Sequence, residues 1–321
     1  MKVVVFGGGT GLSILLRGLK KYTKNISAIV TVADNGGGSG VLRADLGMLP
    51  PGDMRNCIIA LADIEPIMAK LLQHRFKDGY LNGQSFGNLL IAAMYEIFGD
   101  YEHALKEIGS IFRLSGKVLP MTLQDTQLQA TLENGCSILG EKDIPDFVNK
   151  QKCKIDKVSL VPEICSPLVE TIKDINEADI ILVGPGSLYT SVMPNILVEN
   201  IPKLIQNSKA TVFYICNVMT QPGETDNYNV LDHVNAIIKH SDRNFIDYVI
   251  ANDAIISNEA INNYKYQGAS QVLIDEEQRV ALEKLNIKVI SSNFIDIRKN
   301  YIRHNADKIG QVLLDYFNER K

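Results

Sequence analysis

The chain has 321 residues, of which 45% are hydrophobic and 22% are charged, and its formal net charge at pH 7 is -4. This composition is ordinary for a soluble globular protein, and the length suffices for one large α/β domain. The acidic balance argues against nucleic acid as a partner, because nucleic-acid-binding surfaces usually carry a basic stripe. No apolar run reaches the length of a membrane span, and the chain start leads directly into an expected strand instead of a signal peptide.

The five cysteines are scattered and form no C-x-x-C pair, and the five histidines show no spacing typical of metal ligands. Such cysteines are typical of reduced thiols in the cytoplasm, with neither disulfides nor a zinc site. We therefore expect a cytoplasmic protein without a membrane span.

A glycine-rich loop follows the first expected strand. Residues 3–6 form a short, unbroken apolar run, as expected of a strand buried on both faces of a parallel sheet. Four glycines occur within the next five residues, and leucines then recur at helical spacing. A glycine loop that opens onto a helix N-terminus directs free N–H groups and a partial positive charge at one point. We therefore expect phosphate binding at Gly8, Gly9, Thr10, Gly11 and Leu12.

This loop matches neither of two familiar nucleotide fingerprints. Counting from Gly7, a dinucleotide motif G-x-G-x-x-G requires a small residue at the position that Leu12 occupies. A Walker A loop would end in Lys followed by Ser or Thr, which is absent here. The alternative to an anion site is a tight turn that only packs the helix on the strand, although packing does not need four glycines.

A second glycine-rich loop follows the second expected strand, residues 26–33. Its first residue, Asp34, stands where a nucleotide-binding sheet holds a ribose hydroxyl. Adjacent parallel strands would bring both loops to the same carboxyl edge, where ligands bind in open α/β sheets. The candidate contacts of this segment are Asp34, Asn35, Gly36, Gly37, Ser39 and Arg43, with a solvated arginine as the alternative for Arg43.

Two further segments add polar candidates. Residues 49–56 form a loop before an apolar helix, and Asp53 in this loop is either a helix N-cap or a ligand contact. Arg55 and Asn56 lie in the first helical turn, where a cation opposes the helix dipole unless an anion is nearby. Asn88 precedes a mostly apolar helix, and it is either a cap or another contact.

The pattern changes between residues 117 and 160. Two strand-like runs, residues 117–121 and 127–132, are followed by the hairpin signal Asn134-Gly135 and a third apolar run. We interpret residues 117–160 as a small β-rich excursion that serves as a lid or as an oligomer contact.

The alternation of strands and helices then returns. The strand at 180–183 runs into another glycine-containing loop that opens onto a helix, which predicts an anion site at Gly184, Pro185, Gly186, Ser187 and Thr190. The strand at 210–216 ends in a polar loop that contributes Asn217. Further strands are expected at 248–251, 272–274 and 288–290, before a closing helix at 307–320. We predict a doubly wound, mostly parallel α/β sheet with helices on both faces, in a single domain of residues 1–321.

The sequence contains no G-x-S-x-G elbow, no H-E-x-x-H and no Ser/His/Asp set that spacing would reveal. Ser187 is therefore interpreted as a phosphate ligand instead of a nucleophile. Several loops rich in backbone donors and small hydroxyls are expected at one sheet edge, whereas a single phosphate needs only one such loop. The pattern indicates a diphosphate with substituents at both ends.

Four motifs together carry a resemblance to a known family. They are Val5-Phe-Gly-Gly-Gly-Thr-Gly-Leu-Ser13, Val32-Ala-Asp-Asn-Gly-Gly-Gly-Ser-Gly40, Pro50-Pro-Gly-Asp-Met-Arg-Asn-Cys57 and Gly184-Pro-Gly-Ser-Leu-Tyr-Thr-Ser191. Over essentially its whole length, the chain resembles the bacterial gluconeogenesis factors, in the superfamily of the 2-phospho-L-lactate transferases (CofD-like proteins) of deazaflavin coenzyme synthesis. The resemblance implies a Rossmann-like CofD-type domain.

The resemblance also implies a function. It implies a cytoplasmic protein that supports cell shape and envelope synthesis on gluconeogenic carbon sources and binds a UDP-sugar such as UDP-N-acetylglucosamine. The related transferases move a phospholactyl group from a nucleotide-linked donor to a deazaflavin alcohol and use magnesium. A homodimer and protein partners in envelope synthesis are further expectations.

Two departures from the family pattern favour binding over turnover. Asn35 stands where the family commonly has a second Asp, and a neutral ligand weakens a magnesium site and cannot act as a base. Gln84 stands where the family often has His, which removes a potential proton carrier.

Near the C-terminus, Tyr301-Ile-Arg-His-Asn305 resembles a segment associated with nucleotide-sugar binding, which adds Arg303 to the candidates. The alternative for Arg303 is a surface pair with Asp307.

These observations predict a nucleotide-sugar-binding regulator, with the loops 8–11 and 184–187 on the diphosphate and Asp34 on a ribose or sugar hydroxyl. The first alternative is a magnesium-dependent transferase of the phospholactyl type, with Asp34 and Asp53 as metal ligands; apart from these two, no catalytic residue is assigned. The second alternative is an NAD-dependent dehydrogenase, which Leu12 and the second glycine loop disfavour.

Overall fold

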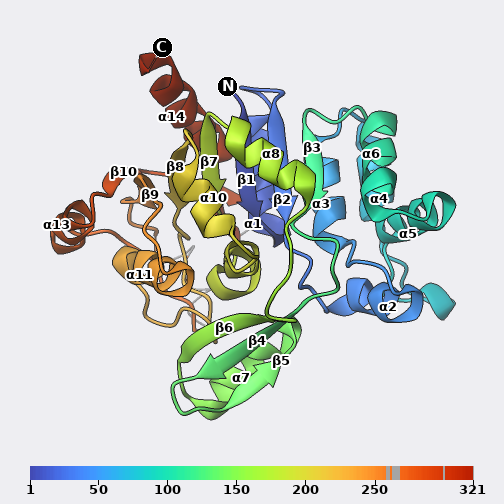
Figure 1. Cartoon of the computed structure of the whole chain (residues 1–321), viewed down its shortest axis with the longest axis horizontal. Coiled ribbons are helices and arrows are strands. Elements are labelled where there is room, and N and C mark those ends of the chain that lie inside the picture. The colour runs from blue at the N-terminus through green and yellow to red at the C-terminus, as the bar shows by residue number, and fades with distance from the viewer. Residues whose placement is uncertain (258–260, 262–267, 299–300, 321) are drawn as a thin grey trace.

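The computed structural model describes residues 1–257, 261, 268–298 and 301–320. Its centre is a seven-stranded sheet in which every strand runs parallel to its neighbours, in the order β10-β9-β8-β7-β1-β2-β3 (Figure 1). The strands are β1 (Val3–Gly7), β2 (Ile26–Val30), β3 (Lys117–Pro120), β7 (Ile180–Val183), β8 (Thr211–Ile215), β9 (Tyr248–Asn252) and β10 (Lys288–Ser292). The predicted doubly wound α/β fold is confirmed.

Helices alternate with these strands along the chain. They are α1 (Gly9–Leu19), α2 (Gly37–Leu46), α3 (Gly52–Leu61), α4 (Pro66–Gln73), α5 (Phe86–Phe98), α6 (Tyr101–Ile111), α7 (Ile144–Gln151), α8 (Val169–Glu177), α9 (Met193–Ile196), α10 (Ile201–Asn207), α11 (Val230–Ser241), α13 (Glu276–Lys284) and α14 (Ala306–Glu319), with the short turns η1 (Gly79–Leu81), η2 (Glu141–Asp143) and η3 (Leu188–Val192). In the described part of the chain, none combines the length and the apolar character needed to cross a membrane.

The helices cover both faces of the sheet because successive residues of a buried strand point to opposite sides. On β1, Val3 and Val5 belong to a hydrophobic cluster with residues of α1, α3 and α14. Val4 and Phe6 belong to a second cluster with residues of α8, α10 and α11. A strand that is apolar on both sides therefore requires this layered arrangement.

A separate antiparallel sheet consists of β4 (Gln127–Leu132), β5 (Ser137–Leu139) and β6 (Ile155–Val161), and Figure 1 shows it with α7 below the main sheet. It corresponds to the predicted β-rich excursion but starts later. β3, which we expected in the excursion, pairs with β2 in the main sheet, and Lys117 at its start bonds to the buried Asp174 of α8.

The C-terminal region differs from the prediction in two places. Residues 272–274 do not form a strand: Gln271 makes an isolated antiparallel bridge with Met219, and Asp275 then caps α13. In addition, β11 (Ile295–Arg298) and β12 (Tyr301–His304) form an antiparallel pair that the sequence analysis did not predict. This pair places Arg303 on a strand.

The order of the strands creates a crevice at the centre of the sheet. β1 lies between β2 and β7, so the chain adds strands on one side first and then returns to add strands on the other side. In open α/β sheets, ligands bind at such a reversal, outside the carboxyl ends of the strands. The glycine loops after β1 and β7 both lie at this point.

Candidate functional site

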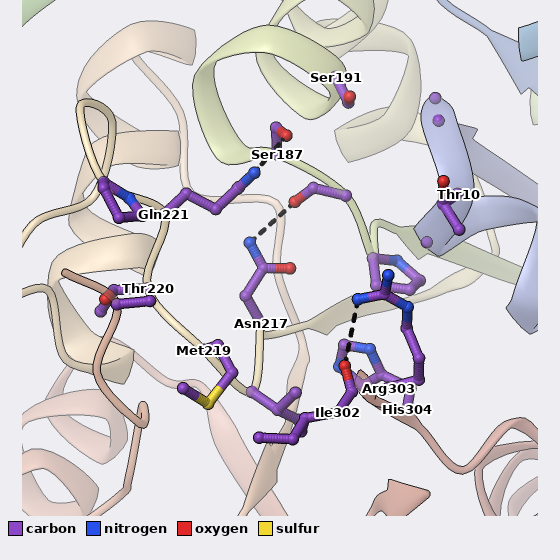
Figure 2. A pocket seen from close by; sticks show the side chains of 18 residues that line it. Thr10, Ser187, Ser191, Asn217, Met219, Thr220, Gln221, Ile302, Arg303 and His304 are labelled. Carbon is purple, nitrogen blue, oxygen red and sulfur yellow. Dashed lines mark hydrogen bonds between the residues drawn. The ribbon is translucent and has the colours of Figure 1, made fainter. Parts of the chain in front are cut away.

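A cavity of about 360 Å³ lies at this crevice. Figure 2 shows its lining, which comes from the loops after β1, β7 and β8, from β12 and from Ala269. The lining residues are Gly8, Gly9, Thr10, Gly11, Pro185, Gly186, Ser187, Ser191, Asn217, Val218, Met219, Thr220, Gln221, Pro222, Ala269, Ile302, Arg303 and His304. Parallel strands thus bring together loops that are far apart in the sequence.

The loops after β1 and β7 pack directly against each other, and this contact requires glycine. A Cβ on Gly11 would lie 3.0 Å from the Pro185 carbonyl oxygen, closer than such atoms normally approach. Gly9 has a φ of +63°, in the left-handed region that favours glycine. The glycines therefore allow two backbone segments to border one cavity.

Two carboxamides hold the loop after β7 in place. Asn217 donates from Nδ2 to the Gly186 carbonyl oxygen at 2.9 Å, and Gln221 donates from Nε2 to Ser187 Oγ at 2.6 Å (Figure 2). Ser187 and Ser191 contribute hydroxyl groups from this loop and from η3. This side of the cavity is therefore polar but carries no charge.

Arg303 is the only Lys or Arg among the described residues that line the cavity. Its guanidinium lies over the Tyr301 ring, 5.1 Å from the ring centroid, and Figure 2 shows the side chain extending from β12 into the cavity. Asp307, the alternative partner, forms an ion pair with Lys21 at 2.7 Å instead. The structure therefore places Arg303 at the cavity and not in the surface pair with Asp307.

Internal carboxyl groups occupy the N-termini of the two helical segments that follow these loops. Asp53 Oδ2 accepts a hydrogen bond from the Gly9 N–H at 2.6 Å, at the start of α1. Glu224 Oε1 accepts a hydrogen bond from the Thr190 hydroxyl at 3.3 Å, at the start of η3. A helix N-terminus stabilises negative charge at such positions. Some donors that the sequence analysis assigned to phosphate are thus already engaged within the protein.

A third carboxyl group, Glu141 of η2, reaches the same region from the antiparallel sheet. Burial raises the pKa of Glu141 to about 8, and the charges of Asp34, Glu224 and Asp53 add to this effect. Burial also raises the pKa of Glu224 to about 7. Neither glutamate was predicted as a site residue from the sequence. Glu224 lies in the polar loop after β8, from which only Asn217 was selected, and no binding or catalytic motif surrounds Glu141.

The structure divides the predicted site residues into two groups. Those that line the cavity are Gly8, Gly9, Thr10, Gly11, Pro185, Gly186, Ser187, Asn217 and Arg303. Those outside its lining are Leu12, Asp34, Asn35, Gly36, Gly37, Ser39, Arg43, Arg55, Asn56, Asn88, Gly184 and Thr190. Ser191, Gln221 and His304 line the cavity without having been selected from the sequence.

Several residues of the outer group have other partners. Leu12 is fully buried in the core. Arg43 forms an ion pair with Asp125. Arg55 donates to Asn88 Oδ1 at 2.9 Å, so polar side chains of neighbouring helices surround this first-turn cation. These contacts hold the loops at the sheet edge together.

Asp34 and Asp53, the magnesium ligands expected for a transferase, lie close to each other. Burial raises the pKa of Asp53 to about 6, and the charge of Asp34 contributes to this shift. No three His, Cys, Asp or Glu side chains of the described residues are arranged as a metal site. Two carboxylates nevertheless suit Mg²⁺, which usually keeps several waters and also binds substrate phosphates.

We expect the affinity for a diphosphate ligand to rise when the pH is lowered from about 7.5 to about 5.5. The pKa of Asp53 is raised to about 6, so its carboxylate becomes neutral in this window and no longer repels phosphate. A unit charge near a phosphate is worth roughly 1 kcal/mol in water, or about fivefold in affinity. Calorimetry checks this, and the affinity of Asp53→Asn should change less with pH. An equal pH dependence in both proteins would contradict the prediction.

Comparison with known proteins identifies the family. The model of the family described as 2-phospho-L-lactate transferase CofD matches residues 3–295. A putative gluconeogenesis factor from Thermoanaerobacterium thermosulfurigenes is 52% identical over 313 residues, which cover 98% of this chain and 96% of the relative. The gluconeogenesis factor of Bacillus subtilis is 45% identical over 319 residues, which cover 99% of this chain and 98% of the relative.

A solved structure agrees with this result. The crystal structure of a member of the UPF0052 family from Bacillus halodurans matches with a TM-score of 0.92 and 44% sequence identity, over 98% of this chain and 99% of that chain. The fold, the family model and the whole-length relatives therefore agree. The chain belongs to the CofD family and, within it, to the gluconeogenesis factors.

Proposed function

We propose that the protein binds a nucleoside diphosphate sugar, such as UDP-N-acetylglucosamine, in the cavity between the glycine loops, as a regulator that does not consume this ligand. The observation that carries the proposal is the composition of the cavity wall. One part consists of the glycine loops after β1 and β7, the hydroxyl groups of Thr10, Ser187 and Ser191, and the Arg303 guanidinium, which together suit a diphosphate. The other part is apolar.

The apolar part belongs to a small hydrophobic cluster, separate from the two large clusters of the fold. Val218, Met219, Ala269 and Ile302 line the cavity and pack in this cluster with Ile256. Such a surface can receive a flat ring, as ligand sites combine apolar walls with a few polar groups. A ligand with a charged diphosphate and a nucleobase matches both parts of the wall.

The cellular role follows from the family resemblance. Relatives that match along the whole chain are named gluconeogenesis factors. We infer that the protein acts in the cytoplasm and supports cell shape and envelope synthesis on gluconeogenic carbon sources. Binding of a UDP-sugar would report the supply of envelope precursors to its protein partners.

A magnesium-dependent transferase is the second candidate, favoured by the closeness of Asp34 to Asp53 and by the family model. These two carboxylates would hold the ion, which would neutralise charge on the phosphates. Asn35 favours the binding function, because its Oδ1 accepts a hydrogen bond from the Lys142 N–H at 3.0 Å. This amide joins the second glycine loop to η2 and supplies no carboxylate.

Calorimetry with UDP-N-acetylglucosamine, UDP, GDP and NAD tests the proposal, followed by chromatography of each ligand after incubation with magnesium. We expect the UDP-sugar to bind and to be recovered intact. We also expect no nucleoside monophosphate when nucleotide-linked phospholactate and a deazaflavin alcohol are supplied together. Failure of every nucleoside diphosphate to bind would refute the proposal. Monophosphate release that is lost in Asp34→Ala would favour the transferase.

A further inference from the structure

We propose that Glu141 and Glu224 bind a divalent cation such as Mg²⁺, with the Thr190 hydroxyl and water molecules completing its coordination. This site differs from the Asp34 and Asp53 pair discussed for the transferase. Because Glu141 belongs to the segment that carries the antiparallel sheet, the cation would link that segment to the carboxyl edge of the main sheet.

Three separate segments bring these oxygen atoms together. Glu141 lies in η2, Thr190 lies in η3, and Glu224 lies in the loop between β8 and α11. Thr190 Oγ1 donates to Glu224 Oε1 at 3.3 Å, and the Thr190 side chain also lowers the pKa of the Glu141 carboxyl group, against the larger effect of burial. One hydroxyl group therefore lies between two carboxyl groups.

Backbone packing supports this arrangement. A Cβ on Gly223 would collide with the backbone of Pro145, so the Glu224 loop and α7 are in direct contact. α7 follows η2 immediately in the chain, which fixes the position of Glu141 relative to Glu224. The relative position of the two glutamates thus depends on the contact between α7 and the loop after β8.

An unpaired atom provides an independent indication of a ligand. Glu224 is 7% exposed, and its Oε2 is buried without a hydrogen-bond partner in the described part of the chain. Buried polar atoms of native proteins are nearly always paired, and a buried carboxylate oxygen without a partner is especially unfavourable. A bound cation would satisfy this atom.

The main charges that act on the two glutamates come from acidic residues. Beyond burial, Asp34 and Asp53 raise the pKa of Glu141, and Asp226 acts on Glu224 in the same direction. No Lys, Arg or His of the described residues is among the main influences on either carboxyl group. A cation that displaces the carboxyl protons would relieve the repulsion among these acidic groups.

The ligand atoms select the class of metal. Carboxylate and hydroxyl oxygens suit Mg²⁺, Mn²⁺ or Ca²⁺ better than metals that prefer nitrogen or sulfur. Mg²⁺ often binds through one or two carboxylates and keeps several waters. The two carboxylates and the hydroxyl group would therefore need waters to complete the shell, since the described residues contain no group of three or more His, Cys, Asp or Glu side chains that could hold a metal ion.

Titration of the full chain with Mn²⁺, followed by electron paramagnetic resonance at about pH 7.5 without nucleotide, tests the site. We expect the parent protein to bind Mn²⁺ and to release it to excess Mg²⁺. Glu141→Gln and Glu224→Gln should each weaken binding by at least about tenfold, because each removes a charged ligand. Glu163→Gln, at an exposed position, is the matched control and should bind like the parent.

Melting temperatures with and without Mg²⁺ distinguish a bound cation from a shared proton. Only the parent and Glu163→Gln should gain stability from Mg²⁺, while the two other variants should remain folded and unresponsive. Absence of Mn²⁺ binding in the parent, or undiminished binding in both variants, would overturn the proposal. If Mn²⁺ binding were lost only in Asp53→Asn, the cation would belong to the Asp34 and Asp53 pair, and the proposal would be overturned as well. Without nucleotide, the result is independent of the proposed function.

Discussion

Replacing Gly9 with Asp is expected to abolish diphosphate binding while the sheet remains folded. Gly9 lines the cavity at the start of α1, and its N–H donates to Asp53 at 2.6 Å. The new carboxylate would add a second negative charge at the point that a phosphate must approach. Two like charges at short range near a protein surface cost several kcal/mol, so we expect the affinity for UDP-N-acetylglucosamine to fall by at least about a hundredfold.

A matched control variant separates the two effects of Gly9→Asp, which are backbone strain and added negative charge. Gly99 has a φ of +67°, its Cβ position has no heavy atom within 4 Å, and it does not line the cavity. Gly9→Asp and Gly99→Asp should therefore lose a similar free energy of unfolding, about 1–2 kcal/mol, but only the first should lose binding. Gly9→Ala adds strain without charge and should bind better than Gly9→Asp. Calorimetry that shows unchanged affinity in a folded Gly9→Asp protein would refute the assignment of this loop.

The second large effect is expected at Arg303, the only Lys or Arg among the described lining residues. A guanidinium bonds two phosphate oxygens at once, and a charge-assisted contact is worth about 1.5–3 kcal/mol. Arg303→Ala should therefore weaken UDP-sugar binding by roughly ten- to a hundredfold. Arg303→Lys keeps the charge but loses the paired geometry, so it should recover only part of the affinity.

The deciding measurement is the dissociation constant for UDP-N-acetylglucosamine at fixed salt. Arg243 provides the control, because it is an exposed arginine that donates to Gln206 Oε1 at 2.6 Å, away from the cavity. Arg243→Ala should bind like the parent. A dissociation constant for Arg303→Ala within about threefold of the parent value would show that Arg303 does not bind the ligand and only contacts the Tyr301 ring.

The predictions that the structure confirms depend on local signals. The apolar residues 3–6 suffice to indicate a strand buried on both faces, and alternating elements suffice to indicate a doubly wound sheet. The wrong assignment of β3 to the β-rich excursion shows what local signals cannot predict. The strand-like run at 117–120 has the same local pattern whether it pairs with β2 or with the antiparallel sheet, and only the free edge of β2 decides between the two pairings.

The candidate site divides in the same way. Backbone N–H groups in a glycine loop are positioned by the strand and helix on either side, so the loops 8–11 and 184–187 could be named from the sequence. Side chains that reach across the fold could not be assigned in this way. Arg43 and Arg55 carried plausible charges, but their guanidinium groups bond to Asp125 and Asn88.

The fold class and the glycine loops at the sheet edge could be predicted from the sequence because each depends on residues adjacent in the chain, and the family could be predicted from four motifs spread along it. Only the tertiary structure decided which charges meet there. The Gly9 N–H is shared with Asp53, and Glu141 arrives beside Glu224 from the segment of the antiparallel sheet. These contacts join segments far apart in the chain, and their geometry comes from the packing of α1, α3 and α7 against neighbouring loops, which no local sequence pattern predicts.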